Sequence, residues 1–449
     1  MRTSLKSLSI VLASVAILTI GAQQGTDFFQ LADPNKDGFI TREELRGAMQ
    51  HWLGGRERVD QNQLGKALEE ALPENAFLRM ISPPQNRTPK AEDVEKMLAA
   101  LPAAAPGKPA KPRKVLVLCT CAGYVHSCIP LAAKTVESLG SKTGAWTTAV
   151  SYEASVITAA NLKQYDLVFL NNTTGFFLDD PDPGVTAARK KALLDFVRSG
   201  KGLAGVHAAG DSYHQSPDGL GLGGMLGGGV LSAADKDDDK TVDGPELNAL
   251  ADTWFEKVDT SHAGKVSVQE FKAAFPRLLF SSGRRSGAPA MPAAKAGPDH
   301  QAGTWPDFNR MIGGYFKYHW LDPQHIVYKI DDPASPLTAM FKDGFEINDE
   351  TYTFGVNSWS RENLHVLTSI DYSKMAEADR LKEDYPRADH DYGLSWIRRE
   401  GKGRVFYAAH GHSERVYASK PMLEHLLAGV QYGLGDLKAN DAASVKAKK

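Results

Sequence analysis

From residue 114 onward, short apolar runs alternate with stretches in which apolar residues recur at helical spacing. Continuous apolar runs of this length are typical of strands buried on both faces, and the stretches between them are typical of amphipathic helices. We expect strands at 114–119, 150–153, 167–171 and 203–206, and helices at 129–139 and 188–199. This order predicts an α/β domain whose parallel sheet is covered by helices on both faces.

The α/β pattern breaks after residue 226 and resumes near Trp305. Between these points, residues 226–276 are helical and acidic, and residues 281–304 are a low-complexity stretch of Ser, Gly, Ala, Pro and Arg. Insertions are tolerated at surface loops, so we interpret 226–276 as an insertion in an α/β domain that spans 113–435. The stretch 281–304 is expected to be a linker.

The N-terminus has its own apolar pattern. Arg2 and Lys6 precede an apolar run at 8–20, which ends in the small residues Gly21 and Ala22. This arrangement is typical of a signal peptide, so we assign residues 1–22 to one and expect export to the periplasm or the extracellular space. An uncleaved anchor is the alternative, but the run is short and its exit is polar. Because no later apolar stretch approaches ~20 residues, we expect no membrane span in the mature chain.

The remaining segments are assigned from their composition. Residues 23–82 have a helical pattern, whereas residues 83–112 are rich in Pro, Ala and Lys and form a linker around one short helix at 91–101. The polar tail at 436–449 is expected to be disordered.

Composition and charge narrow the classes of function. A hydrophobic content of 42% and a charged content of 24% are those of a globular protein. The formal net charge of −2 gives no indication of a nucleic-acid partner. The three cysteines, Cys119, Cys121 and Cys128, are too few for a disulfide scaffold. We expect Cys119 to pack in the core, and one disulfide involving Cys128 stays open.

Two segments, 28–72 and 230–276, repeat one order of features: an acidic loop, a helix with a Trp, a weaker loop and another helix. The first acidic loop, 33–44, fits the EF-hand pattern, in which oxygen ligands at alternating positions surround a calcium ion. Gly38 stands at the sixth position, where the backbone turns sharply. The expected ligands are Asp33, Asn35, Asp37, the Phe39 carbonyl, Thr41 and Glu44.

The acidic loop of the insertion, 235–246, fits almost as well. It departs from the pattern at Lys240, where glycine is expected, and this substitution strains a left-handed backbone position. Without an ion its crowded carboxylates would repel one another, which favours a cation site over a solvated acidic run. The expected ligands are Asp235, Asp237, Asp239, the Thr241 carbonyl, Asp243 and Glu246.

Each strong loop is followed by a degraded one. Loop 259–270 has Ala263 where an oxygen ligand is needed, and Gln63 stands where the first pair needs its second Glu. We therefore expect two EF-hand pairs, in which Ile40 meets Val59 and Val242 meets Val266. One shared helix must connect Glu246 to Asp259. Exported EF-hands bind calcium weakly, with Kd of about 10⁻⁴–10⁻³ M, so a structural role is favoured over switching.

Several motifs of the α/β domain resemble the ThuA-like (trehalose utilisation) family. These are KVLVL at 114–118, GYVH at 123–126, YDLVFLNNTTG at 165–175, GKGLAGVHAAGD at 200–211, IGGYFKYH at 312–319, INDETY at 347–352 and GKGRVFYAAHGH at 401–412. The resemblance implies a flavodoxin-like fold of the class I glutamine amidotransferase type. That superfamily has a nucleophilic Cys on a tight turn after a strand. The corresponding turn here has His207 and neither Cys nor Ser, so amidotransferase chemistry is not supported.

Histidines follow several of the predicted strands. Ligands of open α/β sheets bind at the carboxyl ends of the strands, so these side chains are expected at one edge. Imidazoles can act as a general acid or base, and a group of them can hold a divalent transition metal. The candidate catalytic residues are His126, His207, His319, His412, Asp349 and Glu350. His214 and His410 have weaker claims. Asn171 and Asn172 could bind sugar hydroxyls or satisfy buried backbone.

Three functions remain open from sequence. The resemblance implies carbohydrate utilisation of the trehalose type, with a sugar substrate and the histidine group as catalytic site. The alternative is a non-catalytic carbohydrate- or protein-binding module with structural calcium sites. In a third interpretation the inserted EF-hands sense calcium and gate the pocket, since the insertion lies between His207 and His319. Whether the chain is an enzyme is undecided at this stage.

Overall fold

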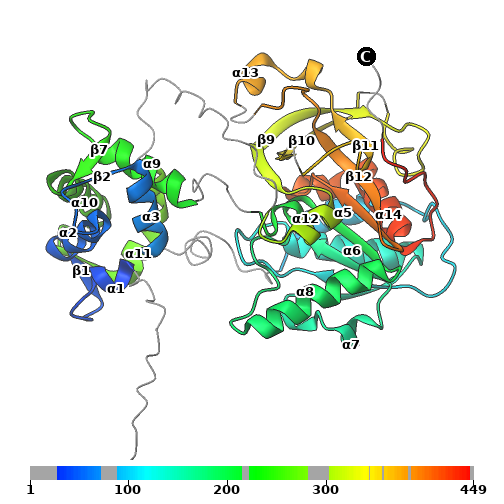
Figure 1. Cartoon of the computed structure of the whole chain (residues 1–449), viewed down its shortest axis with the longest axis horizontal. Helices are drawn as coiled ribbons and strands as arrows, with labels where there is room; N and C mark the ends of the chain where they lie inside the picture. The colour runs from blue at the N-terminus through cyan, green and yellow to red at the C-terminus, as the bar shows by residue number, and fades with distance from the viewer. Residues whose placement is uncertain are drawn as a thin grey trace, which may run out of the picture.

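The computed structural model describes residues 28–71, 88–214, 222–281, 303–342, 344–355, 358–382 and 386–444 (Figure 1). The expected signal peptide, 1–22, and nearly all of the linker at 281–304 lie outside these residues. Within the described part of the chain, none of the helices is both long enough and apolar enough to cross a membrane.

The central sheet of the described residues has nine strands, and one half of it is parallel. The strands expected at 114–119, 167–171 and 203–206 form there because their apolar side chains are buried, whereas the strand expected at 150–153 forms at 147–151, on the sheet edge, with Val150 41% exposed. In spatial order the parallel half contains β4 (Thr147–Ser151), β3 (Lys114–Leu118), β5 (Leu167–Asn171), β6 (Gly202–Val206) and β13 (Gly403–Ala408).

The other half of the sheet is antiparallel and extends the expected parallel core. A short turn with Gly401 at φ +58° joins the first of its strands to β13 as a hairpin, and no helix intervenes that could return the chain in parallel. From β13 outward the order is β12 (Gly393–Glu400), β11 (His365–Ile370), β9 (Phe316–Ile330) and β10 (Glu346–Phe354).

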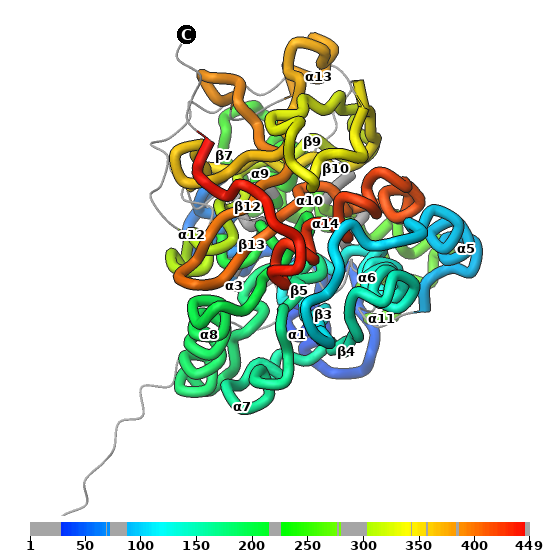
Figure 2. Tube along the Cα trace, turned by 90° about the vertical axis from the view of Figure 1, so that its right-hand side faces the viewer, coloured from blue at the N-terminus to red at the C-terminus, as the bar shows by residue number. Residues whose placement is uncertain are grey.

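Helices cover both faces of the sheet, as expected, and create two apolar cores (Figure 2). On one face lie α5 (Ala91–Ala100), α6 (Ile129–Thr143) and α14 (Lys420–Leu434). On the other face lie α7 (Ala159–Leu162), α8 (Pro183–Arg198) and α12 (Pro306–Ile312). This layering leaves the carboxyl ends of the parallel strands available for a site.

The two EF-hand segments fold together into one helical lobe with its own core (Figure 1). Stacked and edge-on rings join them: Phe28 stacks on Phe275, and Trp52 meets Trp254. The N-terminal segment supplies α1 (Phe28–Ala32), α2 (Arg42–Gln50) and α3 (Gln61–Ala71). The insertion supplies α9 (Leu222–Ala234), α10 (Gly244–Val258) and α11 (Val268–Ser281). As expected, α10 is the one helix that connects its two loops.

The pairing of the loops differs from the expectation and is exchanged between the segments. The contact β1 (Phe39–Thr41) with β8 (Lys265–Ser267) places Ile40 opposite Val266. The contact β2 (Arg58–Asp60) with β7 (Thr241–Asp243) places Val59 opposite Val242. The predicted pairs Ile40–Val59 and Val242–Val266 are therefore wrong. The exchange allows the apolar faces of both segments to close over one core, and each strong loop still pairs with a degraded one.

The ends of the insertion meet beside the sheet. Thr304 donates to the Tyr213 carbonyl from its backbone N–H at 2.8 Å and from its hydroxyl at 3.0 Å. The chain therefore leaves and re-enters the α/β domain at adjacent points, as expected for an insertion in a surface loop.

Part of the tail departs from the expectation of disorder. Asp436 pairs with Arg113, and Tyr432 donates to Asp441 at 2.9 Å. The Ser444 N–H donates to the Leu364 carbonyl at 2.8 Å. Residues 436–444 are thus packed on the domain, because their carboxylates find cationic and hydroxyl partners there.

Candidate functional site

Four of the predicted side chains converge at the carboxyl edge of the sheet. His126 follows β3, His207 follows β6, His412 follows β13, and Glu350 lies on β10. Each offers one ligand atom, and all four atoms lie within 4.8 Å of one another. The ring of His126 lies 4.9 Å from those of both His207 and His412. We call these four residues the His–Glu cluster.

His207 occupies a strained turn directly after its strand. Its backbone has φ +44°, a left-handed conformation that is uncommon for a residue other than glycine. Its Nδ1 lies 2.8 Å from the Ala409 carbonyl, so Nδ1 carries the proton and Nε2 presents a lone pair. The turn after β6 therefore presents an imidazole nitrogen to the cluster.

The imidazole nitrogens of the cluster are buried and poorly satisfied. Within the described residues, His126 Nδ1, His207 Nε2 and His412 Nδ1 have no hydrogen-bond partner. The Glu350 carboxylate oxygen Oε1 lies 3.4 Å from His207 Nε2 and 3.5 Å from His412 Nδ1. These separations exceed an ordinary charge-assisted hydrogen bond of about 2.7–2.9 Å. The nitrogens of the three histidines and the Glu350 oxygen therefore lie close together without forming short hydrogen bonds to one another.

Electrostatics favour an ionised Glu350 carboxylate and a neutral His126 imidazole. Burial alone would raise the pKa of Glu350, but His207 and His412 outweigh it and hold that pKa well below its usual range. Burial, followed by the neighbouring imidazoles of His207 and His412, lowers the pKa of His126. Burial also lowers the pKa of His412, but its contact with Glu350 outweighs this effect and raises it.

His319 lies at the open side of the cluster. Its Nδ1 is 3.5 Å from the second oxygen of Glu350, and its side chain is 32% exposed. Burial lowers its pKa. A neutral, partly exposed imidazole here can accept a proton from a bound molecule.

Asp349 is placed behind the cluster and differs from the role expected for it. It is fully buried, and its carboxylate accepts from the backbone N–H groups of Gly411, His412 and Ser413 at 2.8, 3.1 and 2.9 Å. It therefore positions the loop that carries His412. His410, in the same loop, contacts Tyr328 Oη at 2.6 Å and Thr351 Oγ1 at 3.0 Å and is equally a positioning residue.

Aromatic side chains around the cluster were not predicted as site residues. The Tyr124 ring lies 4.8 Å from that of His126, and the Tyr352 ring lies 4.1 Å from that of His207. Phe316 stacks at 5.5 Å on His319. All three belong to motifs that carry the family resemblance, and this membership could have identified them as candidate site residues.

The remaining candidates are structural. Asn171 and Asn172 are fully buried, and Asn171 donates to the Ile129 carbonyl at 2.9 Å, so neither faces a sugar. The three cysteines are free and buried, which rules out a disulfide at Cys128 in this structure. Burial raises the pKa of Cys119 to about 12, and a thiol so shifted is inert.

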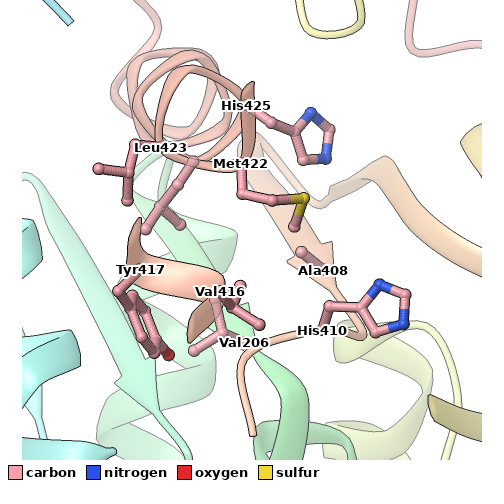
Figure 3. A pocket seen from close by; sticks show the side chains of 9 residues that line it. Val206, Ala408, His410, Val416, Tyr417, Met422, Leu423 and His425 are labelled. Atoms are coloured by element: carbon pink, nitrogen blue, oxygen red, sulfur yellow. The ribbon is translucent and has the colours of Figure 1, made fainter. Parts of the chain in front are cut away.

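A small apolar cavity lies beside His410 (Figure 3). It has a volume of about 20 Å³ and is lined mainly by Val206, Val416, Met422, Leu423 and His425. This space holds one water molecule at most, so it cannot take a substrate.

The two acidic loops, 33–44 and 235–246, share several backbone features. Gly38 has φ +83° and Lys240 has φ +68°, so lysine adopts the left-handed turn that glycine supplies in the first loop. Asp33 accepts from the N–H of Asp37 at 3.1 Å, and Asp235 accepts from that of Lys240 at 3.1 Å. Asp235, Asp237 and Asp239 each place an oxygen within 4.8 Å of the others.

Comparison with known proteins identifies the family. The sequence model described as trehalose utilisation, ThuA, matches residues 114–275 and 290–433, which is more than half of the chain. The chain belongs to the ThuA family. An EF-hand domain model matches residues 26–51, which places a calcium-binding motif at the N-terminus of this ThuA-family protein. No curated protein sequence matches the chain.

Two solved structures that are similar to this chain are described as ThuA-like proteins. A ThuA-like protein from Bacteroides uniformis shares 14% identity, with a TM-score of 0.43, over 75% of this chain and 98% of its own. A ThuA-like protein from Parabacteroides merdae shares 14% identity, with a TM-score of 0.39, over 74% of this chain and 93% of its own.

Proposed function

We propose that this ThuA-family protein is an exported, metal-dependent enzyme that acts on a hydroxylated small molecule of the sugar class. In this proposal His126, His207, His412 and Glu350 hold one divalent transition metal, and the EF-hand lobe holds calcium in a structural role. The sugar class comes from the family description, trehalose utilisation, and export from the N-terminal pattern.

The observation that carries the proposal is the set of unpartnered, buried nitrogens in the His–Glu cluster. A buried polar atom without a partner costs about 1–3 kcal/mol, so three of them in one place need a compensating ligand. Neutral imidazoles and a carboxylate are the donors that Zn²⁺ and related ions prefer. The Ala409 carbonyl fixes the tautomer of His207, as carbonyl groups do for metal-ligating histidines.

The chain's own groups indicate how a substrate would be handled. A bound divalent ion would polarise a substrate oxygen or lower the pKa of water. His319 would accept or return a proton at the open side of the cluster, since its side chain is partly exposed. Tyr124, 37% exposed, would form an aromatic wall on which the apolar face of a sugar ring can rest.

For calcium, we propose one ion in each strong loop. The ligands are those expected from sequence, with Asp33 and Glu44 at the ends of one loop and Asp235 and Glu246 at the ends of the other. The exchange of partner strands suits a structural role, because each ion would stabilise a contact between the N-terminal segment and the insertion.

The metal proposal is tested by elemental analysis of the purified full chain after incubation with zinc and removal of excess ion. Wild-type protein should retain about one zinc per chain, and His207→Ala should retain far less. His325→Ala is the matched control, because His325 is half exposed and pairs with Glu346 outside the cluster. Equal zinc in His207→Ala and wild type would contradict the proposal. Zinc-dependent conversion of a sugar panel, followed by chromatography, then tests for turnover.

A further inference from the structure

A polar pocket of about 270 Å³ adjoins the His–Glu cluster. His412 belongs to both: it lines the pocket, and its Nδ1 faces Glu350. Another part of the wall comes from Lys90 and Asp93 at the start of α5. A molecule bound in the pocket would therefore lie beside both α5 and the cluster.

All the side chains that line this pocket are polar or charged. Glu414 accepts a hydrogen bond from the Ser127 hydroxyl at 2.7 Å, and Arg415 pairs with Asp322. Ser413 is 5% exposed, and its hydroxyl has no hydrogen-bond partner among the described residues. The Ser413 hydroxyl is closed off even from the pocket, so the groups available to a ligand are the other polar side chains of the wall.

The charges of the wall define the class of ligand. The carboxylates of Asp93, Asp322 and Glu414 face the cations of Lys90 and Arg415, so the wall has no excess positive charge to attract an anion. Alternating acceptors and donors without an apolar surface match hydroxyl groups, which both donate and accept. A volume of about 270 Å³ has room for a group the size of one sugar ring.

We propose that this pocket is a substrate subsite that binds a neutral, polyhydroxylated group, with Lys90 and Asp93 as its specificity-determining residues. The inference rests on the proposed function, since it assigns the part of the substrate next to the reacting group. The residues proposed to set specificity are not part of the ThuA family match, because that match begins at residue 114 and α5 precedes it in the chain.

The α5 wall is held firmly enough to serve as a recognition surface. Met97 is fully buried in the core that α5 shares with α6, and Lys142 donates to the Leu101 carbonyl at 3.2 Å. A helix anchored on one face can hold the polar residues of its first turn in place at little cost in ordering on binding.

The test is calorimetric titration of the zinc-loaded full chain with glucose and, separately, with inorganic phosphate. The double variant Lys90→Ala, Asp93→Ala removes the α5 wall, and Lys96→Ala, Glu95→Ala makes the same charge change on an exposed part of the helix. Zinc content is measured for all three proteins. We expect glucose binding to weaken about tenfold or more in the pocket variant, as for the loss of hydrogen bonds to charged groups.

The outcomes separate this inference from the metal proposal. Weaker glucose binding in the pocket variant alone, with unchanged zinc, supports the subsite. Equal glucose binding in the pocket variant and wild type would overturn it, as would binding of phosphate in place of glucose or absence of glucose binding to wild type. A wild-type protein that retains no zinc would contradict the proposed function. The glucose titrations of the same samples would still show whether Lys90 and Asp93 contribute to glucose binding.

Discussion

At the scale of single residues, Lys240 and Gly38 occupy the same position in the two strong calcium loops. Both have positive φ, and a side chain at that conformation costs about 1 kcal/mol relative to glycine. We predict that Lys240→Gly strengthens calcium binding in loop 235–246 about fivefold, and that Gly38→Ala weakens it in loop 33–44 by a similar factor. Calcium titration calorimetry measures both.

Lys236→Gly is the control, because Lys236 is outside the set of residues with positive φ and glycine there gains nothing. If Lys240→Gly leaves the calcium affinity of loop 235–246 unchanged, the positive φ of Lys240 does not weaken calcium binding.

His425 gives a pH-dependent prediction. Burial lowers its pKa to about 4, so below pH 6.5 the unfolded chain takes up a proton that the native imidazole does not. Stability from this group is therefore fully present above pH 6.5 and is lost as the pH falls toward 4, by about 3 kcal/mol. Urea unfolding of His425→Gln should show a shallower fall in the free energy of unfolding over this range than wild type.

His325→Gln, which changes a half-exposed histidine, should keep the wild-type slope. If His425→Gln and wild type lose stability equally, the buried histidine does not titrate as described.

The sequence predicted which candidate residues converge only where they follow strands that run in the same direction. His126 and His207 follow strands predicted to be parallel, whose carboxyl ends share one edge, so their convergence was predictable, whereas the strand before His412 was not among those predicted. Asp349 and Glu350 are consecutive on β10, whose pairing with β9 changes register between Asp349 and Thr351. Such an irregularity disrupts the regular alternation of faces and is not visible in the sequence, so the sequence did not indicate which carboxylate faces the cluster.

At the scale of elements, the exchanged pairing of the calcium loops is the main departure from prediction. Adjacent loops were expected to pair because they are close in the chain. The observed arrangement instead adds contacts between segments, among them the bidentate pair of Arg46 with Asp252 at 2.7 Å and the ring contacts of Trp52 with Trp254. Such long-range complementarity has no local signature in sequence. The buried strands at 114–119, 167–171 and 203–206 and the helices beside them, with their strong local patterns, were predictable, whereas the antiparallel strands β9 to β12 were not.

The exchange predicts which loop each valine supports. Truncation of Val266 should weaken calcium binding at loop 33–44, because Val266 lies opposite Ile40. Truncation of Val59 should weaken binding at loop 235–246, because Val59 lies opposite Val242. Each Val→Ala change is expected to cost about 1–2 kcal/mol of packing.

Titrating each variant in an Asp33→Ala or an Asp235→Ala background leaves one strong loop to report. The reverse assignment, with Val59 supporting loop 33–44, would mean that adjacent loops pair in solution.

At the scale of the whole molecule, the EF-hand lobe and the α/β domain have separate apolar cores. Deletion of residues 28–71 should therefore unfold the insertion, whose apolar residues lose their partners, while the His–Glu cluster keeps its metal. Calorimetry should show the loss of one calcium-dependent thermal transition with retention of the other, and elemental analysis should show unchanged zinc. Loss of zinc with the deletion would indicate that the calcium lobe supports the metal site.

The proposed binding of a metal ion by His126, His207, His412 and Glu350 can be observed directly. The measurement is an anomalous difference map from crystals of the zinc-incubated protein, with data collected on both sides of the zinc absorption edge. We expect one strong peak, present only above the edge, within about 2.0–2.2 Å of an imidazole nitrogen from each histidine and of a Glu350 oxygen. A map with no peak among these four residues would contradict the proposed binding.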